Sequence, residues 1–283
     1  MPLTTTGELV GRAAAAGSAV ASFNVITLEH VEAVIAGAES VDAPVVLQVS
    51  ENAVKFRYGR LLPLARAAVA AAERAAVPVA LHLDHVQSDA LLRQAPDAGF
   101  GSVMYDAARL TYAENLAATR AAVDWAHARG LWIEAELGEI GGKGTTPLDA
   151  HAPGARTDPE QARAFVADSG VDALAVAVGT THAMTTRTAT LDHALLGRLS
   201  AALDVPLVLH GSSGLPDTEL TAAVGSGIAK VNIGTALNLA MTGAIREFLA
   251  AHPEAVDSRG YLTVGREAMT RAVADLITTL APH

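Results

Sequence analysis

Short apolar segments alternate along the chain with longer alanine-rich segments in which apolar residues recur with a helical period. Eight of the short segments have the length and β-branched content of buried parallel strands. They are residues 18–25, 44–49, 77–84, 102–106, 131–137, 173–178, 206–210 and 230–233. Eight strands separated by helices predict a TIM (β/α)8 barrel, and the 283 residues are near the ~250 typical of that fold. A doubly wound open sheet is the alternative, but no glycine-rich dinucleotide turn follows the first segment.

Each predicted strand has a polar side chain at or near its carboxyl end. In a barrel, the carboxyl ends of all strands converge on one face, so these residues can form one site. Helix capping or a loop hydrogen bond explains several of them singly, and their joint placement favours function. Strict alternation would send Asp84 and His85 to opposite faces, so we expect a bend in the third strand there. The polar residues are Asn24, Ser50, Asp84 with His85, Asp106, Glu136, His182, His210 and Asn232.

One long polar connection follows the fifth strand, from residue 138 to residue 159. It is rich in glycine and proline, and loops of this length in compact domains are commonly lids over active sites. We expect a flap over the barrel mouth, ended by a helix that Thr157 or Asp158 caps and Pro159 begins. No repeat, linker or charge block divides the chain, so residues 1–283 are assigned to one domain.

Charge and composition narrow the classes of function. A net charge of −10 argues against a nucleic-acid surface or an anionic-membrane surface, because either needs clustered Lys and Arg. Cysteine is absent, so any metal must be held by His, Asp and Glu. The first residues lack the pattern of a signal peptide, and no stretch approaches the ~20 apolar residues of a membrane helix. We therefore expect a cytoplasmic protein.

Three of the ten histidines, His85, His182 and His210, fall at the ends of predicted strands. Three neutral imidazoles with an open fourth position form a typical catalytic zinc site. His82 is interpreted as a packed histidine or one that supports a ligand, and His30 is expected on a solvated helix face. Glu134 and Glu136 share a face of the fifth strand. With Asp106 they can reach a second metal, or they can satisfy a polar barrel interior.

Two small turns follow the seventh and eighth strands. Residues 211–214 read GSSG and residues 232–235 read NIGT. TIM barrels often bind phosphate through backbone amides at this position, where glycine permits close approach and hydroxyl groups donate. Together the two turns predict a phosphate site.

Five blocks of sequence resemble those of one enzyme family, in the same order and with the same spacing. The blocks are LHLDH, EAELGEIGG, GVDALAVAVGTTH, PLVLHGSSG and KVNIGT, and the similarity runs from SFNV at residue 22 to SRGYLTVGREAM near residue 269. The chain is similar to the class II, zinc-dependent ketose-bisphosphate aldolases, especially those of the tagatose-bisphosphate and short fructose-bisphosphate type.

The resemblance implies roles for particular residues. Asp84 would be the catalytic acid/base, and His85, His182 and His210 would bind one catalytic zinc ion. Asp106 and Glu136 match positions that can hold a second metal ion, and a monovalent cation is an alternative there. Dihydroxyacetone phosphate would be held by residues that include Asn24, Ser50, Ala183, Gly211, Ser212, Ser213, Asn232, Ile233, Gly234 and Thr235.

The sequence departs from the family pattern in several places. Ala183 replaces the usual glycine after the second zinc histidine, and residues 143–145 replace a stretch that usually carries a loop carboxylate. Ala236 and Asn238 replace an acidic residue and a cation. These differences leave the metal chemistry intact and predict altered recognition of the aldehyde half of the substrate.

We therefore predict a zinc-dependent class II aldolase that cleaves a phosphorylated ketose, fructose or tagatose bisphosphate or an analogue, to dihydroxyacetone phosphate and an aldehyde. A metal-dependent sugar-phosphate isomerase or epimerase is one alternative. Another is a non-catalytic or weakly active partner subunit of an aldolase, although such a subunit would be expected to lose Asp84 or the three histidines. The expected partners are phosphorylated ketoses and trioses and further copies of the chain, in a homodimer or homotetramer.

Overall fold

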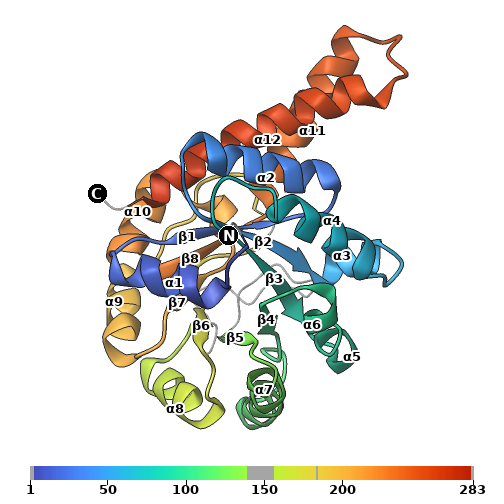
Figure 1. Ribbon diagram of the computed structural model, residues 1–283. Helices are drawn as coiled ribbons and strands as arrows, with labels where there is room; N and C mark the ends of the chain where they lie inside the picture. Colours follow the sequence, from blue (N-terminus) through green and yellow to red (C-terminus); the bar gives the residue numbers. More distant parts are fainter. Residues whose placement is uncertain (1–2, 139–155, 183, 282–283) are drawn as a thin grey trace.

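A computed structural model describes residues 3–138, 156–182 and 184–281. Eight parallel strands form a closed barrel in which every strand pairs with its neighbours in sequence and β1 pairs with β8. Figure 1 looks into this barrel, with the helices arranged around the strands. The predicted TIM barrel is confirmed, and the open doubly wound sheet is excluded. The strands are β1 Val20–Asn24, β2 Val45–Ser50, β3 Val79–Val86, β4 Ser102–Tyr105, β5 Trp132–Leu137, β6 Ala173–Val176, β7 Leu207–Leu209 and β8 Ile228–Ile233.

The helices cover the outside of the barrel because their alanine-rich and leucine-rich faces pack on the outward side chains of the strands. They are α1 Thr6–Ala15, α2 Leu28–Ser40, α3 Glu51–Phe56, α4 Leu62–Ala72, α5 Asp89–Leu92, α6 Ala95–Ala98, α7 Tyr112–His127, α8 Pro159–Ser169, α9 His193–Ala202, α10 Asp217–Gly225, α11 Thr235–Ala251 and α12 Ser258–Leu280, with a short 3-10 helix, η1 Ser212–Gly214.

Helix α1 closes the amino-terminal end of the barrel. Its apolar residues Leu9 and Val10 pack against the first residues of the strands, including Val46 and Ala229. The Thr6 hydroxyl shares a hydrogen bond with Ser102 of β4. The strands finish at the opposite end, which no described helix closes in the way that α1 closes this one.

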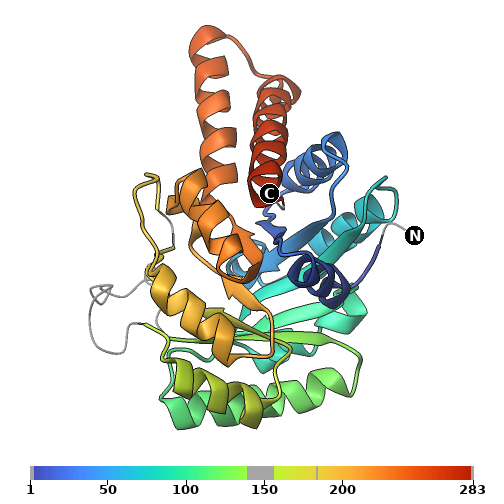
Figure 2. The same ribbon diagram turned by 90° about the vertical axis from the view of Figure 1, so that its left-hand side faces the viewer.

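Helices α11 and α12 form a long hairpin that extends away from the barrel (Figures 1 and 2). The inner part of α12 packs on α2, where a Cβ atom on Gly37 would lie 2.6 Å from the Cβ atom of Val273. The outer part is more open, and Leu237 is the one residue of α11 that is fully buried. This hairpin therefore presents apolar side chains such as Leu239 and Leu249 to solvent.

Thr157, just before α8, contacts the end of β5 and the residue that follows β6. Thr157 donates its hydroxyl to the Leu137 carbonyl at 2.6 Å and accepts from the Ala177 amide at 2.8 Å, which joins β5, β6 and the start of α8. Asp158 caps α8 through the Gln161 amide, so Asp158, of the two predicted candidates, is the cap. Within the predicted flap segment, residues 138–159, residues 139–155 lie outside the described residues, so the flap stays a prediction.

Candidate active site

Strand β3 bends where Asp84 and His85 meet. His85 has a backbone φ of +50°, in the left-handed region that non-glycine residues rarely adopt, and the pairing of β3 with β4 shifts between Leu83 and Val86. Such a residue costs about 1–3 kcal/mol and persists only when its surroundings hold it. The bend expected from the sequence is confirmed, and it lets both side chains reach the barrel mouth.

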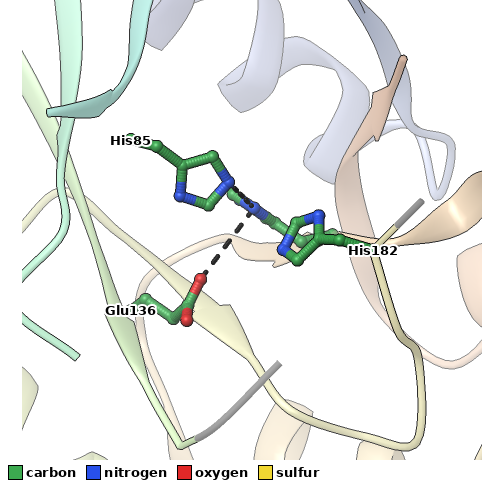
Figure 3. A group of neighbouring side chains, drawn as sticks. His85, Glu136 and His182 are labelled. Atoms are coloured by element: carbon green, nitrogen blue, oxygen red, sulfur yellow. Dashed lines mark hydrogen bonds and ion pairs between the residues drawn. The ribbon is translucent and has the colours of Figure 1, made fainter. Parts of the chain in front are cut away.

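Four side chains gather at this mouth, two from strands β3 and β5 and two from the segments that follow β6 and β7. His85, Glu136, His182 and His210 each offer one ligand atom, and these atoms all lie within 4.8 Å of one another. Figure 3 shows His85, Glu136 and His182 pointing toward a common centre. Three imidazoles and one carboxylate form a donor set that suits a divalent transition metal such as zinc.

The hydrogen bonds behind two histidines fix which nitrogen faces the centre. His85 donates from Nδ1 to Asp106 Oδ2 at 2.9 Å, and His210 donates from Nε2 to Glu134 Oε1 at 2.9 Å. Asn232 Nδ2 also lies 3.0 Å from His210 Nε2, but two donors cannot bond to each other, so Glu134 is the partner of that N–H group.

The two remaining nitrogens, His85 Nε2 and His210 Nδ1, then face each other as lone pairs at 3.1 Å. Lone pairs at that separation repel each other unless a cation or a proton lies between them. The donor set therefore fits a metal ion by its own geometry.

Asp84 lies beside this group and is buried, with 2% of its surface exposed. Asn24 donates to its Oδ2 at 2.9 Å, and Asn232 donates to its Oδ1 at 3.4 Å. Burial raises the pKa of Asp84, but positive charge held at His85 and His210 and on Lys230, with the Asn24 hydrogen bond, outweighs it. The pKa of Asp84 therefore lies below its ordinary value, and the side chain is a carboxylate that can accept a proton.

A cavity of about 860 Å³ opens above Asp84 and the histidines. Eight of the ten predicted phosphate residues line it: Asn24, Ser50, Gly211, Ser212, Ser213, Asn232, Gly234 and Thr235. Ile233 does not, since its side chain packs in the core. Ala183 lies outside the described residues.

The two predicted anion-binding turns lie together in the structure. Gly211 has a φ of +69°, and its Cα lies so close to Thr181 that an added Cβ would meet that residue's carbonyl oxygen at 2.9 Å. Ser212 donates to the Asn232 carbonyl at 2.6 Å, and Ser213 accepts from the Ala236 amide at 3.2 Å. Both hydroxyls thus tie the two turns together. Ser213 only accepts in this contact, so its hydroxyl hydrogen can still donate to an anion, together with backbone amides at the start of α11.

Three more of the predicted site residues, Ser50, Glu136 and Asp106, have defined contacts, and their predicted roles stay predictions. Ser50 caps α3 through the Ala53 amide at 3.2 Å as well as lining the cavity. Glu136 lies with the three histidines, and Asp106 lies behind His85, so their assignment to a second metal remains a prediction.

The expectation that His30 is solvated is wrong. His30 is 3% exposed, with Nδ1 3.0 Å from the Thr27 hydroxyl and Nε2 3.4 Å from Asn238 Oδ1. The chain fold brings α11 against α2 at this point, which helical periodicity within α2 does not reveal.

The sequence left open whether Glu134 satisfies a polar barrel interior, and sequence reasoning missed Lys230 and Gln48, which complete a polar layer beneath the site. Lys230 is fully buried and donates to Glu134 Oε2 at 2.8 Å and to Asn232 Oδ1 at 2.7 Å. Gln48 similarly donates to Asn24 Oδ1 at 2.8 Å and orients that amide. A signal for Lys230 was present, because a charged residue two places before Asn232 in an apolar strand must share its face.

The comparisons with known proteins agree with this geometry. The family model for "Fructose-bisphosphate aldolase class-II" matches residues 4–282. The chain belongs to the class II fructose-bisphosphate aldolase family. As a class II aldolase it is a metal-dependent lyase that cleaves a phosphorylated ketose, as predicted from the sequence.

Solved structures give the same result. The YdjI aldolase of Escherichia coli K12 is 31% identical over 99% of this chain and 98% of its own, with a TM-score of 0.86. A putative fructose-1,6-bisphosphate aldolase from Coccidioides immitis is 31% identical over 98% and 96%, with a TM-score of 0.84. The Campylobacter jejuni fructose-bisphosphate aldolase, at 24% identity over 98% and 95% and a TM-score of 0.82, shares the fold. No helix among the described residues of this class II aldolase is long and apolar enough to span a membrane.

Proposed function

We propose that this class II aldolase uses one zinc ion, held by His85, His182 and His210, to cleave fructose or tagatose bisphosphate or a close analogue. The observation that carries the proposal is the four-membered donor group beside the buried Asp84 carboxylate. Glu136 is the fourth group within reach of the same centre. When bound there, zinc supplies a Lewis acid that polarises the ketose carbonyl.

Asp84 acts as the general base in cleavage. Its carboxylate takes the proton from the hydroxyl that becomes the aldehyde, and it returns that proton in the reverse, condensing direction. The amides of Asn24 and Asn232 hold both carboxylate oxygens, so the proton acceptor is fixed before the substrate arrives. Its lowered pKa keeps Asp84 ionised at neutral pH.

Phosphate of the dihydroxyacetone half binds at the turns after β7 and β8. Glycine at 211 and 234 lets the backbone approach the ligand, and helix α11, 17 residues long, begins at Thr235 with its amides at this end. The phosphate is thereby held without a lysine or arginine from these two turns.

The experiment that tests the proposal measures bound metal and dihydroxyacetone phosphate release from both bisphosphates, with and without a chelator. We expect about one zinc ion per chain and activity that is lost with chelator and recovered with zinc. Asp84→Asn, which keeps the shape of the side chain, should retain zinc and lose turnover by a factor of at least ~10². Full activity in this variant, or in chelated protein, would refute the mechanism.

We also propose that the chain assembles as a homodimer or homotetramer. The support is the exposed apolar surface of the hairpin formed by α11 and α12, which includes Leu239 and Leu249. The single-domain assignment and the cytoplasmic location expected from the sequence stay predictions.

A further inference from the structure

Glu51 connects two loops at the barrel mouth. It is the first residue of α3, directly after β2, and its side chain reaches across to the exit of β3. One carboxylate oxygen, Oε2, accepts from the backbone amides of Gln87 at 2.7 Å and Ser88 at 3.3 Å. The other, Oε1, pairs with Lys55 at 2.8 Å.

These contacts lie next to the strained residue of the site. Gln87 follows His85 by two positions, and His85 is held at a φ of +50° where β3 slips in register against β4. A backbone in the left-handed region relaxes unless neighbouring groups hold the chain on both sides. On the side before His85, the Asp84 carboxylate is held by Asn24. On the side after it, the Asp106 amide holds the Val86 carbonyl, and Glu51 holds the Gln87 and Ser88 amides.

Glu51 is suited to this task by burial and by charge. It is 8% exposed, so water competes poorly for its oxygens. Hydrogen bonds from backbone amides to a carboxylate are also stronger than those to a neutral acceptor. The Asp106 carboxylate fixes the rotation of the His85 ring through Nδ1, and the Asp106 backbone amide donates to the Val86 carbonyl at 2.8 Å. The two carboxylates therefore control different degrees of freedom of the same ligand.

We propose that Glu51 is a positioning residue for the metal site. By holding the Gln87 and Ser88 amides, it stabilises the bend that aims His85 Nε2 at the other ligands. The inference depends on the metal site of the proposed function, and it assigns Glu51 no contact with the substrate. Loss of the carboxylate should weaken metal binding even though Glu51 is not a ligand.

The test compares Glu51→Ala, Glu51→Gln and Lys55→Met in the full-length protein, with the zinc dissociation constant measured by competition with a chromophoric chelator. Supporting residues of metal ligands typically contribute 10- to 100-fold in affinity, and we expect a loss of about 10-fold or more in Glu51→Ala. Glu51→Gln keeps an acceptor for the Gln87 amide and should lose less. Lys55→Met removes only the ion pair and should bind zinc like wild type.

Two further readouts separate this role from general destabilisation. Cobalt in place of zinc should give an altered visible spectrum in Glu51→Ala and a wild-type spectrum in Lys55→Met. In the metal-free proteins, hydrogen exchange at the Gln87 amide should be faster in Glu51→Ala than in wild type.

The outcomes are distinct. Unchanged zinc affinity and cobalt spectrum in Glu51→Ala would overturn the inference. If Glu51→Ala does not fold, Glu51→Gln decides, because affinity equal to that of Lys55→Met would also overturn it and weaker affinity would support it. If wild type binds no metal, the proposed function fails. Unchanged hydrogen exchange at the Gln87 amide in metal-free Glu51→Ala would independently refute the positioning role of Glu51.

Discussion

Replacing Lys230 with methionine removes one charge from the ion pair inside the barrel. Lys230 and Glu134 are both fully buried, and 2.8 Å separates Nζ from Oε2. At an effective dielectric constant of about 20, the gross attraction at this distance is about 6 kcal/mol. Desolvation of both groups offsets much of that attraction when the protein folds. Lys230→Met, however, leaves Glu134 desolvated without its cation, and such losses are about 3–5 kcal/mol.

The partner substitution provides the matched control. Glu134→Gln should destabilise the protein by a similar amount, because it leaves the Lys230 ammonium buried without a carboxylate. The double variant has no buried charge at either position, so it should be more stable than either single variant, with a coupling energy of several kcal/mol. Additive losses in the double variant would refute the reasoning.

Urea unfolding of the metal-free proteins, followed by circular dichroism and tryptophan fluorescence, measures these differences. With a slope of about 3 kcal/mol per molar urea, a loss of 4 kcal/mol lowers the midpoint by roughly 1.3 M. Coincidence of the two signals must be checked, because a chain of this size can unfold through intermediates. A midpoint within about 0.2 M of wild type in both single variants would show that the buried pair does not stabilise the barrel.

Two other features give measurable expectations. Gly37→Ala should lower the free energy of unfolding by about 1–3 kcal/mol or more, since the new methyl group would lie 2.6 Å from Val273 and 2.7 Å from the Thr270 carbonyl. Gly197→Ala, in α9 with no atom within 4 Å of the added methyl, should instead stabilise by up to about 1 kcal/mol, and equal Tm changes in the two variants would contradict this reading. Burial lowers the pKa of His30, partly offset by the Asn238 hydrogen bond, so the unfolded chain binds more protons just below pH 6.5. Stability of the metal-free protein should fall with acidification from that pH, by up to about 1.4 kcal/mol per pH unit from this residue, and His30→Gln should flatten the curve; parallel curves for the two proteins would exclude the effect.

The polar residues at the strand ends were predictable because parallel strands in a barrel must all finish on one face. The bend at His85 followed from the same logic, since alternation alone could not bring Asp84 and His85 together. Periodicity thus located both the site and its strained residue.

The supporting contacts were not predictable in this way. Glu134 and Lys230 pair across the barrel, and Glu51 contacts the amides of the neighbouring loop. Their partners depend on barrel closure and on loop conformation, which one strand's alternation does not encode. The order of strands in the barrel therefore follows from local sequence pattern. The contacts that orient the predicted metal-binding side chains depend on segments far apart in sequence.

Closure of the barrel also determines when the first strand of the newly synthesised chain can pair with the last. Strand β1 pairs with β8, with Ser22 beside Asn232, so its partner leaves the ribosome roughly 200 residues after it. At about 5–20 residues per second, this delay is about ten seconds or longer. Throughout that interval β1 has an unpaired edge, and unpaired apolar edges promote aggregation. The nascent chain is therefore most exposed to misassembly during translation, in the period that ends when its last strand emerges.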